Sequence, residues 1–105
     1  MMSSIRMKLL GLASVTLLIA ACERPSDISG GEQLAIDAGC VQCHGTNGVG
    51  TGPTFPNLNG QRANYMYDQL QRYRSGERVD PVMNIQARDL TNAQIDLLSR
   101  YYAAQ

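Results

Sequence analysis

The sequence predicts an all-α domain of three to five short helices, and three observations support this class. Apolar residues recur at helical spacing over 63–75 and again over 91–104. No stretch alternates apolar and polar residues in the manner of a half-buried strand. Most of the glycines and prolines lie between or outside the periodic runs, where they end regular structure.

The first predicted helix runs from residue 29 to residue 38. Ser29 and Glu32 have the spacing of a capping box, in which two side chains bond to free N–H groups of the first turn. One side of this helix carries Leu34, Ala35 and Ala38. We expect that side to face the core because it is apolar at helical spacing.

An uncharged, irregular segment follows the first helix. Between Ala38 and Gln61 there is no Asp, Glu, Lys or Arg, and glycines and prolines recur throughout. Such residues do not continue a regular helix or strand. A loop of this length is uncommon in so small a domain and usually serves function.

A second helix is predicted over 63–75, where Met66, Leu70 and Tyr73 share one face and Gly76 marks the end. These apolar side chains are expected in the core. The segment 77–89 is interpreted as a connecting loop around Pro81.

The last predicted helix begins at Thr91 and runs to about residue 104. Thr91 and Gln94 form a second capping-box pattern. Ile95, Leu98 and Tyr102 recur on one face and predict its buried stripe.

The first 21 residues have the pattern of a secretory signal. Arg6 and Lys8 precede an uncharged apolar run from Leu9 to Ala21 that ends in small residues. A membrane-spanning helix needs about 20 apolar residues, so this run is short for an anchor. We expect residues 1–21 to be removed; an uncleaved anchor helix is the alternative.

The end of this run, Ile19-Ala20-Ala21-Cys22, resembles the lipobox of bacterial lipoproteins. The resemblance implies that Cys22 becomes an acylated first residue on the periplasmic side of a bacterial membrane. Residues 22–28 would then tether the domain 29–105 to that membrane. A free Cys22 thiol, or cleavage elsewhere by ordinary signal peptidase, remains the alternative.

The charge balance argues against nucleic acid as a partner. After residue 21 the chain keeps seven arginines and no lysine against nine acidic residues. A nucleic-acid-binding domain needs a concentrated basic face. With one Phe and no Trp, the chain can also bury only a small core, which a cofactor would have to supplement.

The chemistry is carried by Cys40-Val41-Gln42-Cys43-His44, the attachment pattern of c-type haem. On one helical turn, Cys40 and Cys43 can each form a thioether with a haem vinyl group. The imidazole of His44 then lies under the iron. One covalent haem c is therefore the predicted cofactor.

Two other interpretations of these residues are weaker. A zinc site needs four ligands, and the chain has no other histidine and only Cys22 as a further cysteine. A thioredoxin-like redox pair belongs near a βαβ pattern and leaves His44 without a role.

The second axial ligand is favoured by elimination. His44 is the only histidine, and the only lysine, Lys8, leaves with the signal. Of the two methionines after residue 21, Met66 lies mid-helix, where a core position is expected. Met83 follows Pro81 in a segment interpreted as non-helical, so Met83 is the favoured ligand.

The chain resembles class I cytochromes c over nearly all of residues 29–105. It is most similar to single domains of the two-haem bacterial cytochromes and to their small one-haem relatives. The resemblance rests on the attachment motif 40–45, the segments 48–61 and 65–76, Pro81-Val82-Met83, and the closing segment 89–103. The attachment motif precedes the methionine, as in that family.

The resemblance implies that the first and last helices cross, with Gly30 and Gly31 or Ala35 allowing Tyr101 or Tyr102 to approach closely. It also implies that the carbonyl of Pro56 accepts a hydrogen bond from the imidazole of His44. Such a contact orients a ligating histidine and raises its basicity.

The expected function is electron transfer between redox proteins, without an enzymatic reaction of its own. Histidine and methionine together would fill both axial positions of the iron. The alternatives are a haem enzyme or a gas or redox sensor with an open iron, and a haem subunit of a larger oxidase or dehydrogenase. The uncharged segment 38–61 predicts small, mainly apolar partner contacts that depend only mildly on salt.

Overall fold

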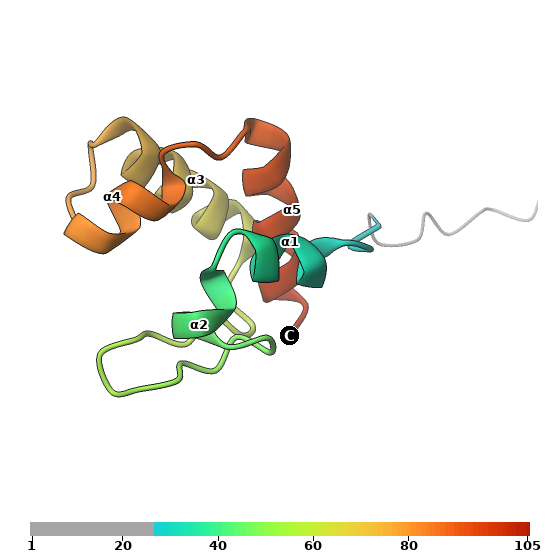
Figure 1. Cartoon of the computed structure of the whole chain (residues 1–105). Coiled ribbons are helices and arrows are strands. Elements are labelled where there is room, and N and C mark those ends of the chain that lie inside the picture. The colour runs from blue at the N-terminus through green and yellow to red at the C-terminus, as the bar shows by residue number, and fades with distance from the viewer. Residues whose placement is uncertain (1–26) are drawn as a thin grey trace, which may run out of the picture.

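The computed structural model describes residues 27–105, and this part of the chain contains helices and no strands (Figure 1). The helices are α1 (Gly31–Asp37), α2 (Cys40–His44), α3 (Ala63–Ser75), α4 (Pro81–Ala87) and α5 (Asn92–Ala103). The all-α prediction is confirmed. None of these helices has both the length and the apolar character required to cross a membrane.

Helix α5 packs against both α1 and α3, while α4 packs on α3 and α2 adjoins α1 (Figure 1). The closest approach of α1 to α5 is at Gly31, where an added Cβ atom would lie 2.6 Å from the Cβ of Tyr101. One turn further on, Ala35 is fully buried. The expected crossing of the first and last helices is therefore present, and small side chains on α1 permit it.

The predicted capping box at the start of α1 is wrong. Gly30 is the N-cap residue, and no side chain bonds to the first turn. Ser29 instead donates from its backbone N–H and its hydroxyl to the carboxylate of Asp27, over 2.8 and 2.9 Å. A polar neighbour two residues earlier thus competes with the cap for the same side chain.

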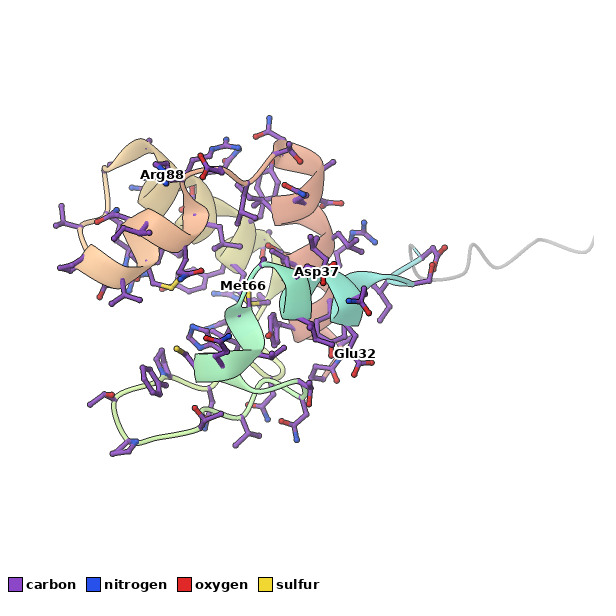
Figure 2. All side chains as sticks on the ribbon, in the orientation of Figure 1. Glu32, Asp37, Met66 and Arg88 are labelled. Atoms are coloured by element: carbon purple, nitrogen blue, oxygen red, sulfur yellow. The ribbon has the colours of Figure 1, made fainter. Side chains whose placement is uncertain are left out.

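The core lies where α1, α3 and α5 meet. Its buried members are Ala35, Met66, Leu98, Tyr101 and Tyr102. Met66, labelled near the centre of Figure 2, retains only 7% exposure, as its mid-helix position predicts. The predicted stripe of α5 is also confirmed, because Ile95, Leu98 and Tyr102 are all buried.

Two helix boundaries follow their sequence signals closely. Helix α3 ends at Gly76, whose φ of 83° lies in the left-handed region that glycine adopts without strain. At the start of α5, the hydroxyl of Thr91 accepts from the N–H of Gln94 over 3.1 Å. The Gln94 side chain accepts in return from the N–H of Thr91 over 2.9 Å, so this capping box is confirmed.

The interpretation of 77–89 as a loop is wrong, because Pro81–Ala87 forms α4. Asp80 is its N-cap residue, and its carboxylate accepts from the N–H groups of Val82 and Met83 over 3.0 and 2.9 Å. Pro81 occupies the first helical position, where its fixed φ suits a helix and no N–H is needed. Asp followed by Pro was therefore the start signal of a helix.

Candidate functional site

The two cysteines of the attachment motif stand on one turn of α2. Cys40 and Cys43 are half-buried, and both thiols are free. Burial raises the pKa of the Cys40 thiol. The turn begins after Gly39, whose φ of 78° sets the angle between α1 and α2. This arrangement leaves two thiols, three residues apart, available to form thioethers.

His44 ends α2 and is almost completely buried, with 8% exposure. Its Nδ1 atom lies 2.8 Å from the carbonyl oxygen of Pro56. A carbonyl oxygen only accepts hydrogen bonds, so Nδ1 must be the donor in this contact. In the neutral ring, Nε2 then carries the lone pair, which is the electron pair that an iron ion binds. The tautomer that this contact selects in the neutral ring therefore fits an iron ligand.

The loop after His44 is tied back to α2 by Thr51. Its N–H donates to the carbonyl of Cys43 over 2.9 Å, and its hydroxyl donates to the carbonyl of Gln42 over 2.8 Å. These bonds satisfy carbonyls at the C-terminal end of α2, which have no partner within so short a helix. Thr51 thus fixes the loop to the backbone just before His44.

Close backbone approaches fold this loop onto itself. An added Cβ on Gly50 would lie 2.0 Å from the carbonyl oxygen of Phe55, so no other residue fits there. The N–H of Gly50 also donates to the Asn57 side chain over 2.7 Å. This turn brings Pro56 back to His44 and depends on the glycines that the sequence concentrates here.

Two tyrosines of α5 hold the residues directly after His44. The hydroxyl of Tyr102 donates to the carbonyl of Gly45 over 3.0 Å, and that of Tyr101 donates to the carbonyl of Thr46. Their rings meet edge to face with centroids 5.0 Å apart. Burial is the main cause that raises the pKa of both hydroxyls. The sequence analysis missed this role, because helical spacing marks a tyrosine as core without showing where its hydroxyl points.

Met83 lies in the first turn of α4 and is half-buried. The side chain of Gln86, near the end of α4, lies close to Gly39, the N-cap residue of α2, because an added Cβ at Gly39 would lie 3.5 Å from Oε1 of Gln86. The end of α4 thus lies near the start of α2, while Met83 and His44 stand at the other ends of these two helices. Met66 belongs to the core instead.

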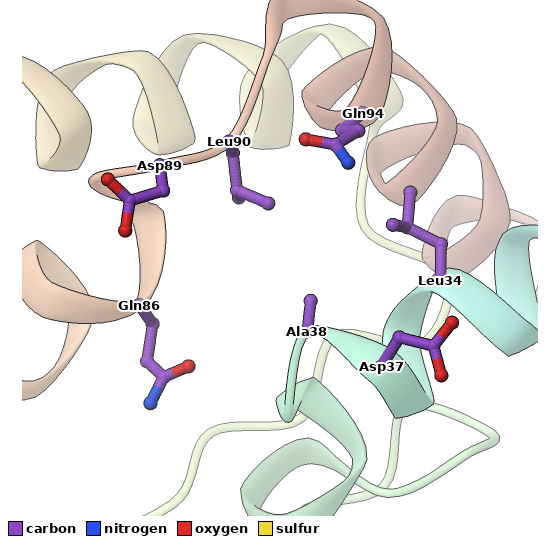
Figure 3. Close-up of a pocket in the computed structure, with 7 residues that line it drawn as sticks. All are labelled: Leu34, Asp37, Ala38, Gln86, Asp89, Leu90 and Gln94. Atoms are coloured by element: carbon purple, nitrogen blue, oxygen red, sulfur yellow. The ribbon is translucent and has the colours of Figure 1, made fainter.

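A pocket of about 250 Å³ lies beside this region, where α1, the end of α4 and the start of α5 meet (Figure 3). It is lined by Leu34, Asp37, Ala38, Gln86, Asp89, Leu90 and Gln94. None of the predicted site residues lines it. Cys22 and the predicted signal lie outside the described residues, as does most of the predicted tether.

The chain is similar in sequence to known c-type cytochromes. A family model for cytochrome c matches residues 28–102. Cytochrome c-554(548) of Halomonas halodenitrificans is 39% identical over 69 residues, which cover 63% of this chain and 83% of that protein. The thiosulfate dehydrogenase electron acceptor of Thiomonas intermedia is 36% identical over 85 residues, covering 71% of this chain but only 39% of its own length.

A solved structure of cytochrome c4 from Acidithiobacillus ferrooxidans has the same fold. Its TM-score is 0.69 at 30% identity, covering 81% of this chain and 53% of that one. The chain therefore spans about half of that cytochrome c4 chain.

The five helices within residues 27–105, with the turn that carries two thiols and an oriented imidazole, define a small haem protein. The chain belongs to the cytochrome c family. It binds haem c covalently, and its single family domain accounts for one haem. Its activity is electron transfer by a c-type cytochrome.

Proposed function

We propose that this chain is a mono-haem electron carrier in which His44 and Met83 are the axial ligands of the iron. The observation that carries the proposal is the contact between Nδ1 of His44 and the carbonyl of Pro56, at 2.8 Å. It holds a buried imidazole in the tautomer and orientation that a permanent ligand requires.

Met83 is proposed as the second ligand because of where the two candidate methionines lie. Met66 has 7% exposure and packs with Leu98 and Tyr102 in the core. Met83 is half-buried in the first turn of α4, outside the core cluster. Its thioether sulfur is therefore the one that can serve as a ligand without disrupting the core.

The chain's own residues have distinct tasks in this proposal. Cys40 and Cys43 attach the cofactor, and Pro56 orients His44. Bound haem supplies an iron that gains and loses one electron, with a potential raised by a methionine ligand. Two permanent ligands leave no position for oxygen or peroxide, which favours a carrier over an enzyme or a gas sensor.

We also propose that Cys22 is acylated after removal of residues 1–21, and that the domain stays tethered to the periplasmic side of a bacterial membrane. Two or three acyl chains anchor a protein stably, whereas a single chain does not. Mass spectrometry of the native protein tests this directly, since it measures cleavage, acylation and haem together. An intact first residue Met1, or an unmodified Cys22, would reject the tether.

The proposed partners are other redox proteins. The relative from Thiomonas intermedia is named as an electron acceptor of thiosulfate dehydrogenase. Because of that likeness, we propose a dehydrogenase of this class as the electron donor of the present chain. Purification in a stable complex with an oxidase or dehydrogenase would instead favour a haem subunit.

The ligation is tested by optical spectra of the purified holoprotein. The oxidised protein is expected to show a sulfur-to-iron charge-transfer band, and the reduced protein is expected not to bind carbon monoxide. Met83→Ala should abolish the band and permit carbon monoxide binding. Met66→Ala should reduce stability and keep the band. A Met83→Ala protein with the parent spectrum would refute the proposal.

A further inference from the structure

Asn84 follows Met83 on α4, and its side-chain amide joins this helix to the end of α3. The N–H of Asp80 donates to Oδ1 of Asn84 over 2.8 Å. Nδ2 of Asn84 donates to the carbonyls of Tyr73 and Arg78, each over 2.8 Å. An amide offers one oxygen and two N–H donors, so these bonds use both donors and the oxygen.

No other type of side chain of this size can make the same three contacts. Two of the partners are carbonyls, which only accept, and the third is a backbone N–H, which only donates. An aspartate at position 84 would set a carboxylate against two carbonyl oxygens. An alanine would leave all three backbone groups without this partner.

The segment to which Asn84 binds, residues 73–78 at and beyond the end of α3, is itself fixed by other contacts. The guanidinium of Arg78 lies 4.7 Å from the ring centroid of Tyr73, and its NH1 donates to Oε1 of Gln69 over 2.7 Å. The N–H of Arg78 also donates to the carbonyl of Arg72 over 3.1 Å. Asn84 therefore attaches α4 to a segment that several other contacts hold in place.

On the other side of Met83, Asp80 holds the first turn of α4. Its Oδ1 accepts from the N–H of Met83 over 2.9 Å, and its carbonyl accepts from the N–H of Asn84 over 2.9 Å. Asp80 and Asn84 thus bond to each other reciprocally, with Met83 between them. The bonds made by Asp80 before Met83 and by Asn84 after it therefore restrain the backbone of Met83 on both sides along the chain.

We infer that Asn84 is a positioning residue for Met83: its amide fixes the first turn of α4 against α3, so that the thioether is presented from a fixed backbone. This inference rests on the proposed ligation by Met83. Without the amide, α4 can move away from α3 while α1, α3 and α5 stay packed. The ligand then leaves the iron in a local opening and not in global unfolding.

The test uses the holoprotein and two substitutions, Asn84→Ala and Asn84→Asp. Matched controls are Asn64→Ala and Asn64→Asp, which make the same chemical changes at an exposed position of α3. The readouts are the sulfur-to-iron charge-transfer band, the rate of carbon monoxide binding to the reduced protein, and helix content by circular dichroism in urea.

Both Asn84 variants are expected to lose the band at urea concentrations where helix content is still intact, and to bind carbon monoxide at least about tenfold faster than the parent. The Asn64 variants should behave like the parent. If the band and the helices disappear together, or if neither Asn84 variant folds, Asn84 has a global structural role and the inference is wrong.

Failure of the ligation and failure of this inference are distinguishable. A Met83→Ala protein that keeps the band refutes the ligation itself. A Met83→Ala protein that loses the band, together with Asn84 variants that match the Asn64 controls, refutes only the role of Asn84.

Discussion

The hydroxyl of Tyr102 donates to the carbonyl of Gly45 over 3.0 Å and so joins α5 to the residue that follows His44. The two residues stand 57 positions apart in the sequence. Tyr102 is 2% exposed, so its hydroxyl makes this bond in a nearly dry environment. The last helix therefore stabilises the core and also holds the backbone of the haem-attachment turn.

Replacing Tyr102 by Phe should lower the free energy of unfolding by about 1 kcal/mol, because the carbonyl of Gly45 loses its donor while the ring remains. Urea denaturation of the holoprotein measures this change. Tyr67→Phe, at a half-buried position on α3, is the control and should stay within about 0.5 kcal/mol of the parent. Equal effects of the two substitutions would contradict the role of the Tyr102 hydroxyl.

Stability should fall at high pH more steeply for the parent than for Tyr102→Phe. Burial raises the pKa of Tyr102 in the folded protein. Unfolded tyrosine titrates near pH ~10, so the contribution of this neutral hydroxyl is complete below that pH and is lost as the pH rises through the folded-state pKa. Measuring the free energy of unfolding of both proteins between pH ~7 and ~11 tests this prediction. Parallel pH dependences for the two proteins would contradict it.

Gly31→Ala should destabilise the contact between α1 and α5. The new methyl group would lie 2.6 Å from Cβ of Tyr101, an atom too close to the backbone to move away freely. Overpacking costs about 1–3 kcal/mol, which outweighs the gain of about 1 kcal/mol in helix propensity. Glu32→Ala, at an exposed position of the same helix, is the control in thermal denaturation. An unchanged midpoint for Gly31→Ala would show that the helices separate easily.

Electron exchange should depend only mildly on salt, because no charged side chain lies between Ala38 and Gln61. Oxidation rates with an anionic and with a cationic small-molecule oxidant are expected to change less than about threefold as salt is raised from low to physiological levels. A steep fall with either oxidant would mean that charged residues outside this segment control access.

Much of the fold follows from local sequence signals. The end of α3 and the start of α5 depend on residues within one helical turn, Gly76 and the pair Thr91 and Gln94. The turn that carries Cys40, Cys43 and His44 also follows from their spacing within five residues, and their role in haem attachment stays a prediction. Helical spacing also identified the buried side of α5.

Local sequence signals predicted the wrong structure where a side chain had competing partners or a helix was very short. Ser29 could cap α1 or bond to Asp27, and the sequence does not rank the two. Asp80 before Pro81 was a helix start that the apolar pattern of so short a helix did not support. The partners of the Asn84 amide and the Tyr102 hydroxyl could not be assigned in advance, because they are backbone carbonyl and N–H groups, which do not depend on the residue type.

The contact between Gly31 and Tyr101 can form only after α5 has been synthesised, and this bears on when a haem can be attached. A chain is synthesised from its N-terminus, so α2 emerges well before α5. Cys40 and Cys43 are then accessible at a time when the helix packing that half-buries them does not yet exist. Covalent attachment of a haem to these thiols does not require α5, so it can precede the packing of α5 against α1.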